Sequence, residues 1–271
     1  LAAGQVWHLD LRDAALPSGF LGSAWVRSSC GALASADRLK PSHQLALSAL
    51  AVEARTGPTD LLVPILYAAH SGWNTGIAVT NLAHGTVTVD LVFADPTGAT
   101  IRSERRTLAP FAQEILYRPD LPPTLGVIGN PDAPIPALAT LHIRATGPIG
   151  VLADTVKYTP TGGRAFTLPA DRPVPAGTSL LFPLALAAAP GDATGIAIAN
   201  ASTLQAPTTV ELWPLEAATP LRLSFVLPGR GLGIVYLPEQ LRALTRFAGT
   251  AVAWSDAGTL AAAGMQVNET I

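Results

Sequence analysis

The sequence contains very little cysteine and very little lysine. One cysteine, Cys30, is present among 271 residues, so no disulfide can form within the chain. Structural zinc sites built from cysteine need several ligands at close spacing, which one cysteine cannot provide. Cys30 is interpreted as a small turn residue, with an intermolecular disulfide or a reactive thiol as the alternative. Lysine occurs only at Lys40 and Lys157, and this usage, with abundant alanine and proline, suggests a GC-rich bacterial source.

Charge and long hydrophobic runs are scarce as well. Charged residues make up 13% of the chain, about half the usual share, and the formal net charge is -2. The sequence therefore has no basic region for a nucleic acid or a membrane surface, and we expect neither partner. The longest apolar stretch, residues 180–190, contains Pro183 and is far shorter than the ~20 residues of a transmembrane helix. It is interpreted as a buried strand, so no membrane insertion is predicted.

The start of the sequence has no initiator methionine and no charged segment followed by an apolar run. We therefore expect a processed or partial N-terminus, with no signal peptide left on it. Leu1 as a natural N-terminus and Leu1 as a fragment boundary both stay open as alternatives.

What the sequence does contain is typical of an all-β protein. Hydrophobic residues make up 49%, and the chain has 24 glycines and 24 prolines that interrupt many short apolar runs. Thr86–Phe93 alternates apolar and polar side chains, as a half-buried strand requires, and Asp95–Gly98 is a β-turn signal. Seven strands are predicted in the middle of the chain, at 61–67, 75–81, 86–93, 100–108, 114–117, 138–145 and 149–157.

Internal repetition is the strongest signal. Three separate blocks recur at one offset of 119 residues, which favours a true duplication. The matching pairs are Leu61–Leu66 with Leu180–Ala185, Thr75–Asn81 with Thr194–Asn200, and Ile115–Pro119 with Ile234–Pro238.

The N-terminal segment fits the same scheme. Gly22–Ser28 resembles Gly249–Ser255, and Ala34–Arg38 resembles Val151–Thr155. We therefore predict three parts: residues 1–55 as the second half of a partial repeat, residues 59–175 as the first complete repeat and residues 177–271 as the second. Proline-rich linkers between the complete repeats predict a semi-rigid connection.

Seven strands in about 119 residues match the immunoglobulin-like class of β-sandwich. The repeated pattern of Pro64, Thr75–Asn81, Asp95–Gly98, Leu108–Pro110 and Gly22–Val26 resembles the tandem immunoglobulin-like β-sandwich repeats of secreted bacterial cell-surface proteins. The resemblance covers nearly the whole chain. It implies an extracellular or cell-surface location and a scaffold, adhesive or surface-layer role, and it implies no catalytic residues.

The residue inventory predicts no enzyme, no cofactor and no metal site. The five histidines fall in different predicted elements and form no closely spaced pair. The glycine-rich segment Gly229–Gly233 lacks the helix and the Gly-Lys-Ser/Thr ending of a phosphate-binding loop and is interpreted as a turn. Among the tryptophans, Trp25 and Trp254 are predicted to be core, and Trp73, in a predicted loop, is the candidate ligand contact.

Two functions from different classes stay open. The first is a structural subunit of an extracellular bacterial filament, sheath or surface layer, whose partners are copies of itself or other parts of a longer repeat protein. A half-sandwich exposes an apolar face and unpaired strand edges, so a neighbouring subunit can complete it by strand addition. The candidate contact residues are Leu45, Leu47, Leu50 and Val52, with an ordinary internal strand as the alternative. The second function is a surface adhesin or carbohydrate-binding stalk, with surface glycans as partners.

Overall fold

The computed structural model describes residues 5–11, 13–17, 24–26, 29, 34–40, 45–50, 57–117, 138–159, 162–170, 172–189, 191–244 and 246–268. Side chains are not described at 38–40, 45–50, 169, 188–189 and 267–268. Cys30 and Val52, both singled out from the sequence, lie outside this part of the chain. Within it the protein is all-β with almost no helix, as the sequence predicts.

The chain divides into two compact units, residues 1–32 and residues 33–271. The described residues of the first unit form turns, in which the N–H of Asp13 donates to the carbonyl oxygen of Asp10 and the N–H of Ala14 to that of Leu11. Residues 24–26, the described part of the segment Gly22–Ser28 that resembles Gly249–Ser255, form no strand.

The second unit contains all the strands of the described chain. They are β1 (Ser35–Lys40), β2 (Leu45–Leu50), β3 (Asp60–His70), β4 (Trp73–Asn81), β5 (Val87–Ala94), β6 (Thr100–Leu108), β7 (Gln113–Tyr117), β8 (Leu138–Ala145), β9 (Ile149–Thr159), β10 (Gly162–Pro169), β11 (Leu180–Ala189), β12 (Asp192–Asn200), β13 (Ala206–Pro214), β14 (Leu221–Leu227), β15 (Leu232–Tyr236), β16 (Phe247–Trp254) and β17 (Leu260–Asn268). A short helix, α1 (Leu237–Gln240), has Pro238 in its first turn, where the missing N–H of proline is tolerated.

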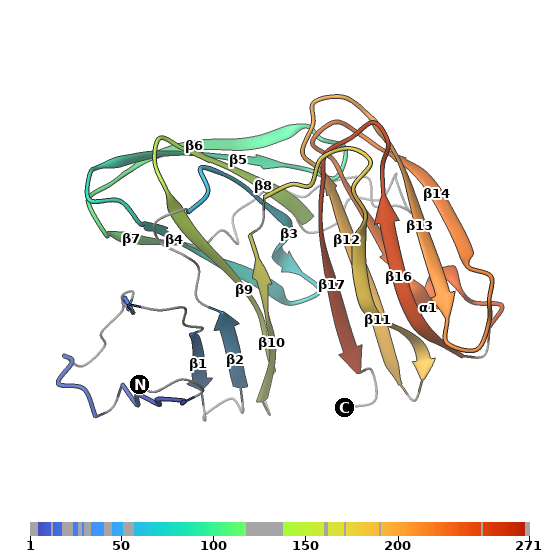
Figure 1. Ribbon diagram of the computed structural model, residues 1–271, viewed down its shortest axis with the longest axis horizontal. Helices are drawn as coiled ribbons and strands as arrows, with labels where there is room; N and C mark the ends of the chain where they lie inside the picture. The colour runs from blue at the N-terminus through green and yellow to red at the C-terminus, as the bar shows by residue number, and fades with distance from the viewer. Residues whose placement is uncertain are drawn as a thin grey trace. The chain divides into compact units, whose positions relative to one another are not determined.

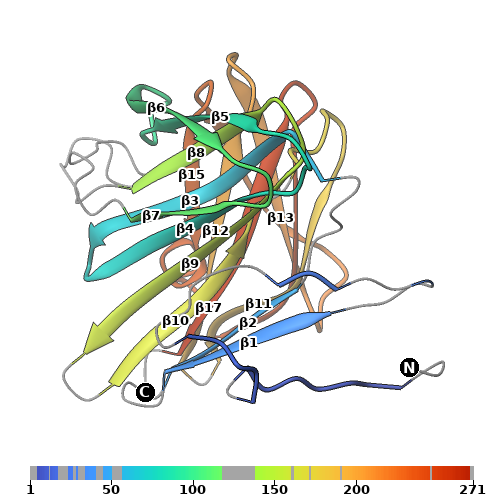
Figure 2. The ribbon, with the colours of Figure 1, turned by 90° about the vertical axis from the view of Figure 1, so that its left-hand side faces the viewer.

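Two large antiparallel sheets are built from these strands (Figures 1 and 2). The first has the order β10-β9-β4-β3-β8-β5-β6, with β7 also paired to β4. The second has the order β14-β13-β16-β11-β12-β15, with β17 also paired to β12. A separate hairpin joins β1 to β2. The seven strands predicted in the middle of the chain are confirmed as β3 to β9, whereas β10 was not predicted.

The strand pairings of β3–β9 are repeated by β11–β17. In both sets the first strand pairs with the sixth and then, after a β-bulge, with the second. Backbone details recur at the same offset: Phe111 has φ 58° and Arg230 has φ 61°, while Gly72 has φ 82° and Gly191 has φ 83°. Below, the first repeat means β3–β10 and the second repeat means β11–β17.

The threonine of the repeated motif supports the bulged strand. Near the point where β3 changes partner from β8 to β4, the N–H of Tyr67 donates to Oγ1 of Thr75 (N···O 3.0 Å). In the second repeat the N–H of Leu186 donates to Oγ1 of Thr194 (2.9 Å). A bulge disrupts the regular ladder, and a buried N–H without a partner is costly. The motif threonine supplies that partner.

The asparagine that ends the motif is fully buried in both repeats. Nδ2 of Asn81 donates to the carbonyl oxygens of Gly85 (2.8 Å), Leu108 (3.1 Å) and Ala109 (2.9 Å), and its Oδ1 accepts from the N–H of Ala83 (2.8 Å). Asn200 makes the equivalent bonds to Ser202, Leu204 and Pro228. The repeated sequence pattern is therefore explained by hydrogen bonds that hold two loops together.

Candidate functional site

The described part of the chain shows no constellation of catalytic or metal-binding type. Within it, no group of three or more histidine, cysteine, aspartate or glutamate side chains is placed to hold a metal ion. Several carboxylates form ion pairs with arginine at strand surfaces, such as Asp90 with Arg105 (2.6 Å) and Glu211 with Arg222 (2.7 Å). The hydrogen bond and charge of Arg105 lower the pKa of Asp90, which keeps that carboxylate ionised at neutral pH.

Trp73, the candidate ligand contact, is the first residue of β4 and does not lie in a loop. It is half-buried in an aromatic cluster, with its ring centroid 5.2 Å from that of Phe166 and 6.5 Å from that of Tyr67. The same Tyr67 ring lies edge-on to Phe166 at 6.2 Å. Such packing gives Trp73 a structural role at the end of the first sheet.

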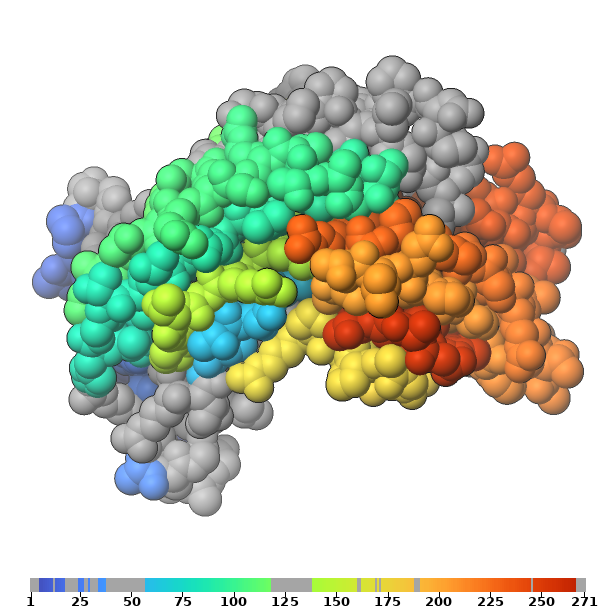
Figure 3. All heavy atoms as spheres, turned by 90° about the horizontal axis from the view of Figure 1, so that it is seen from above, coloured from blue at the N-terminus to red at the C-terminus, as the bar shows by residue number. Residues whose placement is uncertain are grey.

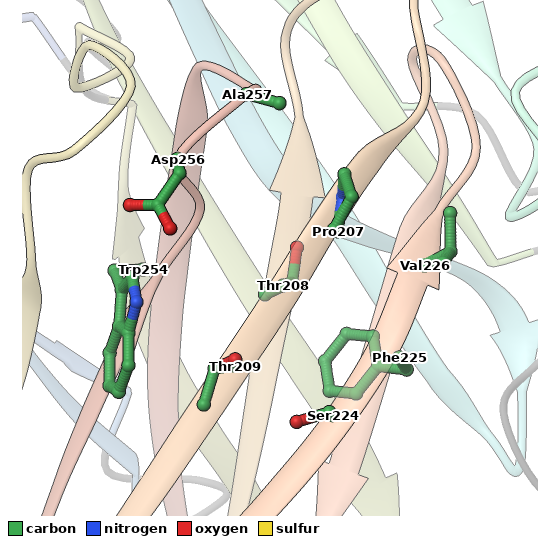
Figure 4. Close-up of a pocket in the computed structure, with 9 residues that line it drawn as sticks. All are labelled: Pro207, Thr208, Thr209, Ser224, Phe225, Val226, Trp254, Asp256 and Ala257. Atoms are coloured by element: carbon green, nitrogen blue, oxygen red, sulfur yellow. The ribbon is translucent and has the colours of Figure 1, made fainter.

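The core prediction for two other tryptophans is wrong. Trp25 is exposed. Trp254 ends β16, where alternation directs Ala251 and Ala253 into the core and leaves Trp254 partly exposed. It lines an open groove of about 500 Å³ together with Phe225, Val226 and Asp256 (Figure 4). Alanine-rich flanks made the strand look uniformly buried, so the period-2 pattern was missed.

The candidate subunit contact lies on β2. Leu45, Leu47 and Leu50 belong to this strand, which pairs with β1 and lies beside β10, and Val52 falls outside the described residues. The side chains of β2 are not described. The strand itself was predicted as a possible pairing element, and its pairing to another subunit stays a prediction.

The feature that sequence reasoning missed is a direct contact between the two repeats. Three residues of the second repeat belong to the same hydrophobic cluster as the core of the first repeat: Ala197, Leu232 and Ala263. Ile234 and Met265 of the second repeat pack against this cluster. A smaller cluster joins Leu62 of the first repeat to Ala199 and Ala261 of the second. The expected linker therefore does not act alone, because the repeats also share a buried apolar contact. Figure 3 shows their atoms side by side.

Strand alternation divides each second-repeat strand between two cores. In β12, Ile196 and Ile198 face the core of their own repeat, while Ala197 and Ala199 face the first repeat. In β17, Leu260 and Ala262 pack in the core of the second repeat. Ala261 and Ala263 of the same strand pack on the first repeat. The small alanine side chains let the first repeat approach this face closely. We call it the β12/β15/β17 face.

The opposing surface is the outer face of β3 and β8, which we call the β3/β8 face. Leu62 is 0% exposed there and stands opposite His142 in the strand register. On the same face, Oγ1 of Thr140 donates to the carbonyl oxygen of Arg230 (3.3 Å). Leu62 and its neighbours thus bury an apolar surface that lies outside the core of the first repeat.

A tight turn contact completes the interface. The N–H of Leu232 donates to the carbonyl oxygen of Pro96 (3.1 Å) in the predicted Asp95–Gly98 turn. Gly98, with φ 87°, lies so close to the carbonyl oxygen of Gly229 that a side chain could not be placed between them. The glycines of both segments are therefore required by close approach of two backbones. The turn predicted at Gly229–Gly233 is confirmed only in its first part, where the N–H of Gly231 donates to the carbonyl oxygen of Pro228 (3.0 Å), because Leu232 and Gly233 already belong to β15.

His142 is a buried titratable group at this contact. Its Nε2 has no hydrogen-bond partner among the described residues. The pKa of His142 is lowered to about 4, mainly by burial and also by the positive charges of Arg230 and Arg144, while the negative charge of Asp60 partly opposes the shift. The imidazole is therefore neutral at pH 7.

Acid is expected to destabilise the protein through His142. Because its folded pKa is depressed, the unfolded chain takes up the proton first, and stability is lost as the pH falls from about 6.5 towards about 4. Between pH 7.5 and 4.5 the wild type should lose about 2 kcal/mol more than H142V, measured by urea unfolding. Valine is the matched replacement because Val252 stands at the equivalent position of the second repeat. Equal losses in the two proteins would show that His142 does not contribute.

No family profile, no curated protein and no solved structure matches this chain. Among the residues that the structure describes, no helix has the length and apolar character needed to cross a membrane.

Proposed function

We propose that this chain is a structural subunit of an extracellular bacterial assembly, such as a filament, a sheath or a surface layer. In this proposal its two complete repeats are immunoglobulin-like β-sandwiches. The observation that carries it is the inter-repeat contact, in which one repeat packs its outer sheet face on the outer face of the next through Leu62, Ala199 and Ala261. A unit that buries apolar surface against its own copy is suited to stacking in series.

Two further features support an assembly role. Several large apolar side chains, such as Leu181, Leu204 and Leu215, are exposed and available for contacts. The β1–β2 hairpin pairs with no further strand in the described chain, so one of its edges is open to strand addition. Extracellular location rests on the resemblance to cell-surface repeats.

The native mass in solution tests this function. Light scattering combined with electron microscopy of the same sample is expected to show polymers or regular filaments that grow with protein concentration. Deleting residues 1–55 then separates strand addition by the N-terminal segment from other contacts. A monomer of 27.9 kDa at all concentrations would contradict self-assembly.

A second candidate function, a surface adhesin or carbohydrate-binding stalk, is favoured by the groove beside Trp254 (Figure 4). Exposed aromatic faces suit stacking on sugar rings, and Asp256 and Thr209 add polar groups to the groove lining. A monomer that binds glycans, with binding lost in Trp254→Ala and kept in Trp73→Ala, would support this function in place of the first.

A further inference from the structure

The β3/β8 face of the first repeat and the β12/β15/β17 face of the second repeat pack on each other. Each of them has an equivalent surface on the other repeat, and that surface is more exposed. Leu181 of β11 stands where Leu62 stands in β3, and it lies opposite Val252 as Leu62 lies opposite His142. We call this surface of the second repeat the β11/β16 face. Leu62 is 0% exposed and Leu181 is 65% exposed, so the same sequence position is covered in one repeat and open in the other.

The first repeat carries the matching surface, the outer face of β4, β7 and β9, called here the β4/β7/β9 face. It is equivalent to the β12/β15/β17 face by strand register. Three pairs of equivalent residues are identical, namely Ala78 with Ala197, Ile115 with Ile234, and Tyr117 with Tyr236. Ile234 packs against the first repeat, whereas Ile115 is 46% exposed.

We propose that the β11/β16 face of one copy of this chain docks on the β4/β7/β9 face of a second copy. The contact would repeat, between chains, the geometry that already joins the two repeats within one chain. This inference rests on the proposed structural function and names its contact surfaces. The partner is a second copy because the equivalent pair of faces already packs together within one chain, and because Leu181 and Ile115 are exposed among the residues that the structure describes.

The turn contact has an open counterpart as well. In the first repeat the turn at Asp95–Gly98 packs on Gly229 and Gly231. The loop of the second repeat that is equivalent to Asp95–Gly98 contains Leu215, which is 76% exposed. The turn of the first repeat that is equivalent to Gly229–Gly231 contains Phe111. Docking in the same geometry would bring Leu215 to the Phe111 turn of the second copy.

The contact between copies is expected to be weaker than the contact within the chain. Three apolar residues of the β12/β15/β17 face are replaced by polar residues on the β4/β7/β9 face: Ala199 by Thr80, Leu232 by Gln113, and Met265 by Asp154. The carboxylate of Asp154 accepts a hydrogen bond from Thr167 (2.9 Å) and keeps that part of the face polar. A contact of this kind assembles reversibly with concentration.

The two docking faces differ from each other, so the contact is heterologous. A docked pair still presents one open face of each kind, and copies therefore add in one direction without a limit unless the rotation closes a ring. This geometry predicts a fibre or a closed ring.

Two arginine variants test the docking faces. L181R blocks the β11/β16 face and I115R blocks the β4/β7/β9 face, and both positions are exposed, so the fold should persist. Each variant is expected to raise the concentration needed for assembly at least about tenfold, because an arginine would be placed in an apolar contact. The control is L244R, at a leucine between α1 and β16 that lies outside both faces and is 45% exposed, compared with 46% for Ile115 and 65% for Leu181.

Mixing the two blocked variants gives the decisive result. The intact β11/β16 face of I115R can bind the intact β4/β7/β9 face of L181R, and no third copy can follow. An equimolar mixture should therefore give a complex of about 56 kDa, twice the chain mass of 27.9 kDa, which only folded variants can form.

Other outcomes separate the two proposals. If the wild type polymerises and L181R and I115R polymerise like L244R, the docking faces are wrong and the structural function stands. If the variants stop assembly but their mixture forms no dimer, the pairing of these two faces is wrong. If the wild type stays monomeric at every concentration, both proposals fail.

Discussion

Leu62→Ala is expected to lower the free energy of unfolding by about 3 kcal/mol. Leu62 is completely buried between the two repeats, where it contacts Ala199 and Ala261, so truncation removes apolar burial and leaves a cavity. The measurement is urea unfolding in dilute protein, followed by circular dichroism or by tryptophan fluorescence.

Leu181→Ala is the matched control for this prediction. Leu181 occupies the equivalent position of the second repeat and is largely exposed, so its truncation should change the stability of the monomer by less than about 0.5 kcal/mol. The difference between the two variants therefore measures the stability contributed by the inter-repeat contact, separate from the general effect of replacing a leucine in a strand. Similar losses at the two positions would show that the second repeat does not cover Leu62 in solution.

Asn81→Ala is expected to lower the free energy of unfolding by about 3–4 kcal/mol. Its side chain makes four hydrogen bonds in a fully buried site, and their removal leaves three carbonyl oxygens and one N–H to find new partners. A buried polar group that loses its partner costs about 1–3 kcal/mol, and partial rearrangement of the loops limits the sum. Thermal and urea unfolding check the value, and Asn200→Ala should behave alike.

Asn74→Ala is the control for an asparagine outside the core. Its Oδ1 accepts one exposed hydrogen bond from the N–H of Ala69 (3.0 Å), so the loss should be about 1 kcal/mol or less. Asn81→Asp, which keeps the size but replaces the donor with a carboxylate facing carbonyl oxygens, should be at least as damaging at pH 7 as Asn81→Ala. A mild effect at Asn81 in both variants would mean that the loops are held by other contacts.

The repeated motifs show which parts of the fold can be predicted from the local sequence. Blocks at one offset of 119 residues, alternating side chains and turn residues predicted β3 to β9 to within a few residues. These signals are local, because the residue types that favour strands and turns act on neighbours along the chain. The threonine and asparagine of the motif were visible as repeats, but their hydrogen bonds to distant backbone groups were not.

Several errors have one cause. Trp254 was placed in the core, β10 was not predicted, and the repeats were expected to be joined by their linker. The sequence shows which residues are apolar or uncharged, but it does not show which surface of the folded protein covers them. The alanine side chains of β12 and β17 fit equally well on a surface strand or against a second sheet, so the inter-repeat contact left no distinct pattern.

The sequence by itself determined that this protein is all-β, where most of its strands lie, and that they come as a duplication. Period-2 alternation and glycine and proline turns are enough for this, since they act over a few residues. Only the tertiary structure decided which outer faces are buried, because burial depends on contacts between residues more than a hundred positions apart. Leu62 and Leu181 occupy equivalent positions in the two repeats. Leu62 is buried because a neighbouring repeat covers it, and Leu181 is exposed because no neighbouring repeat does.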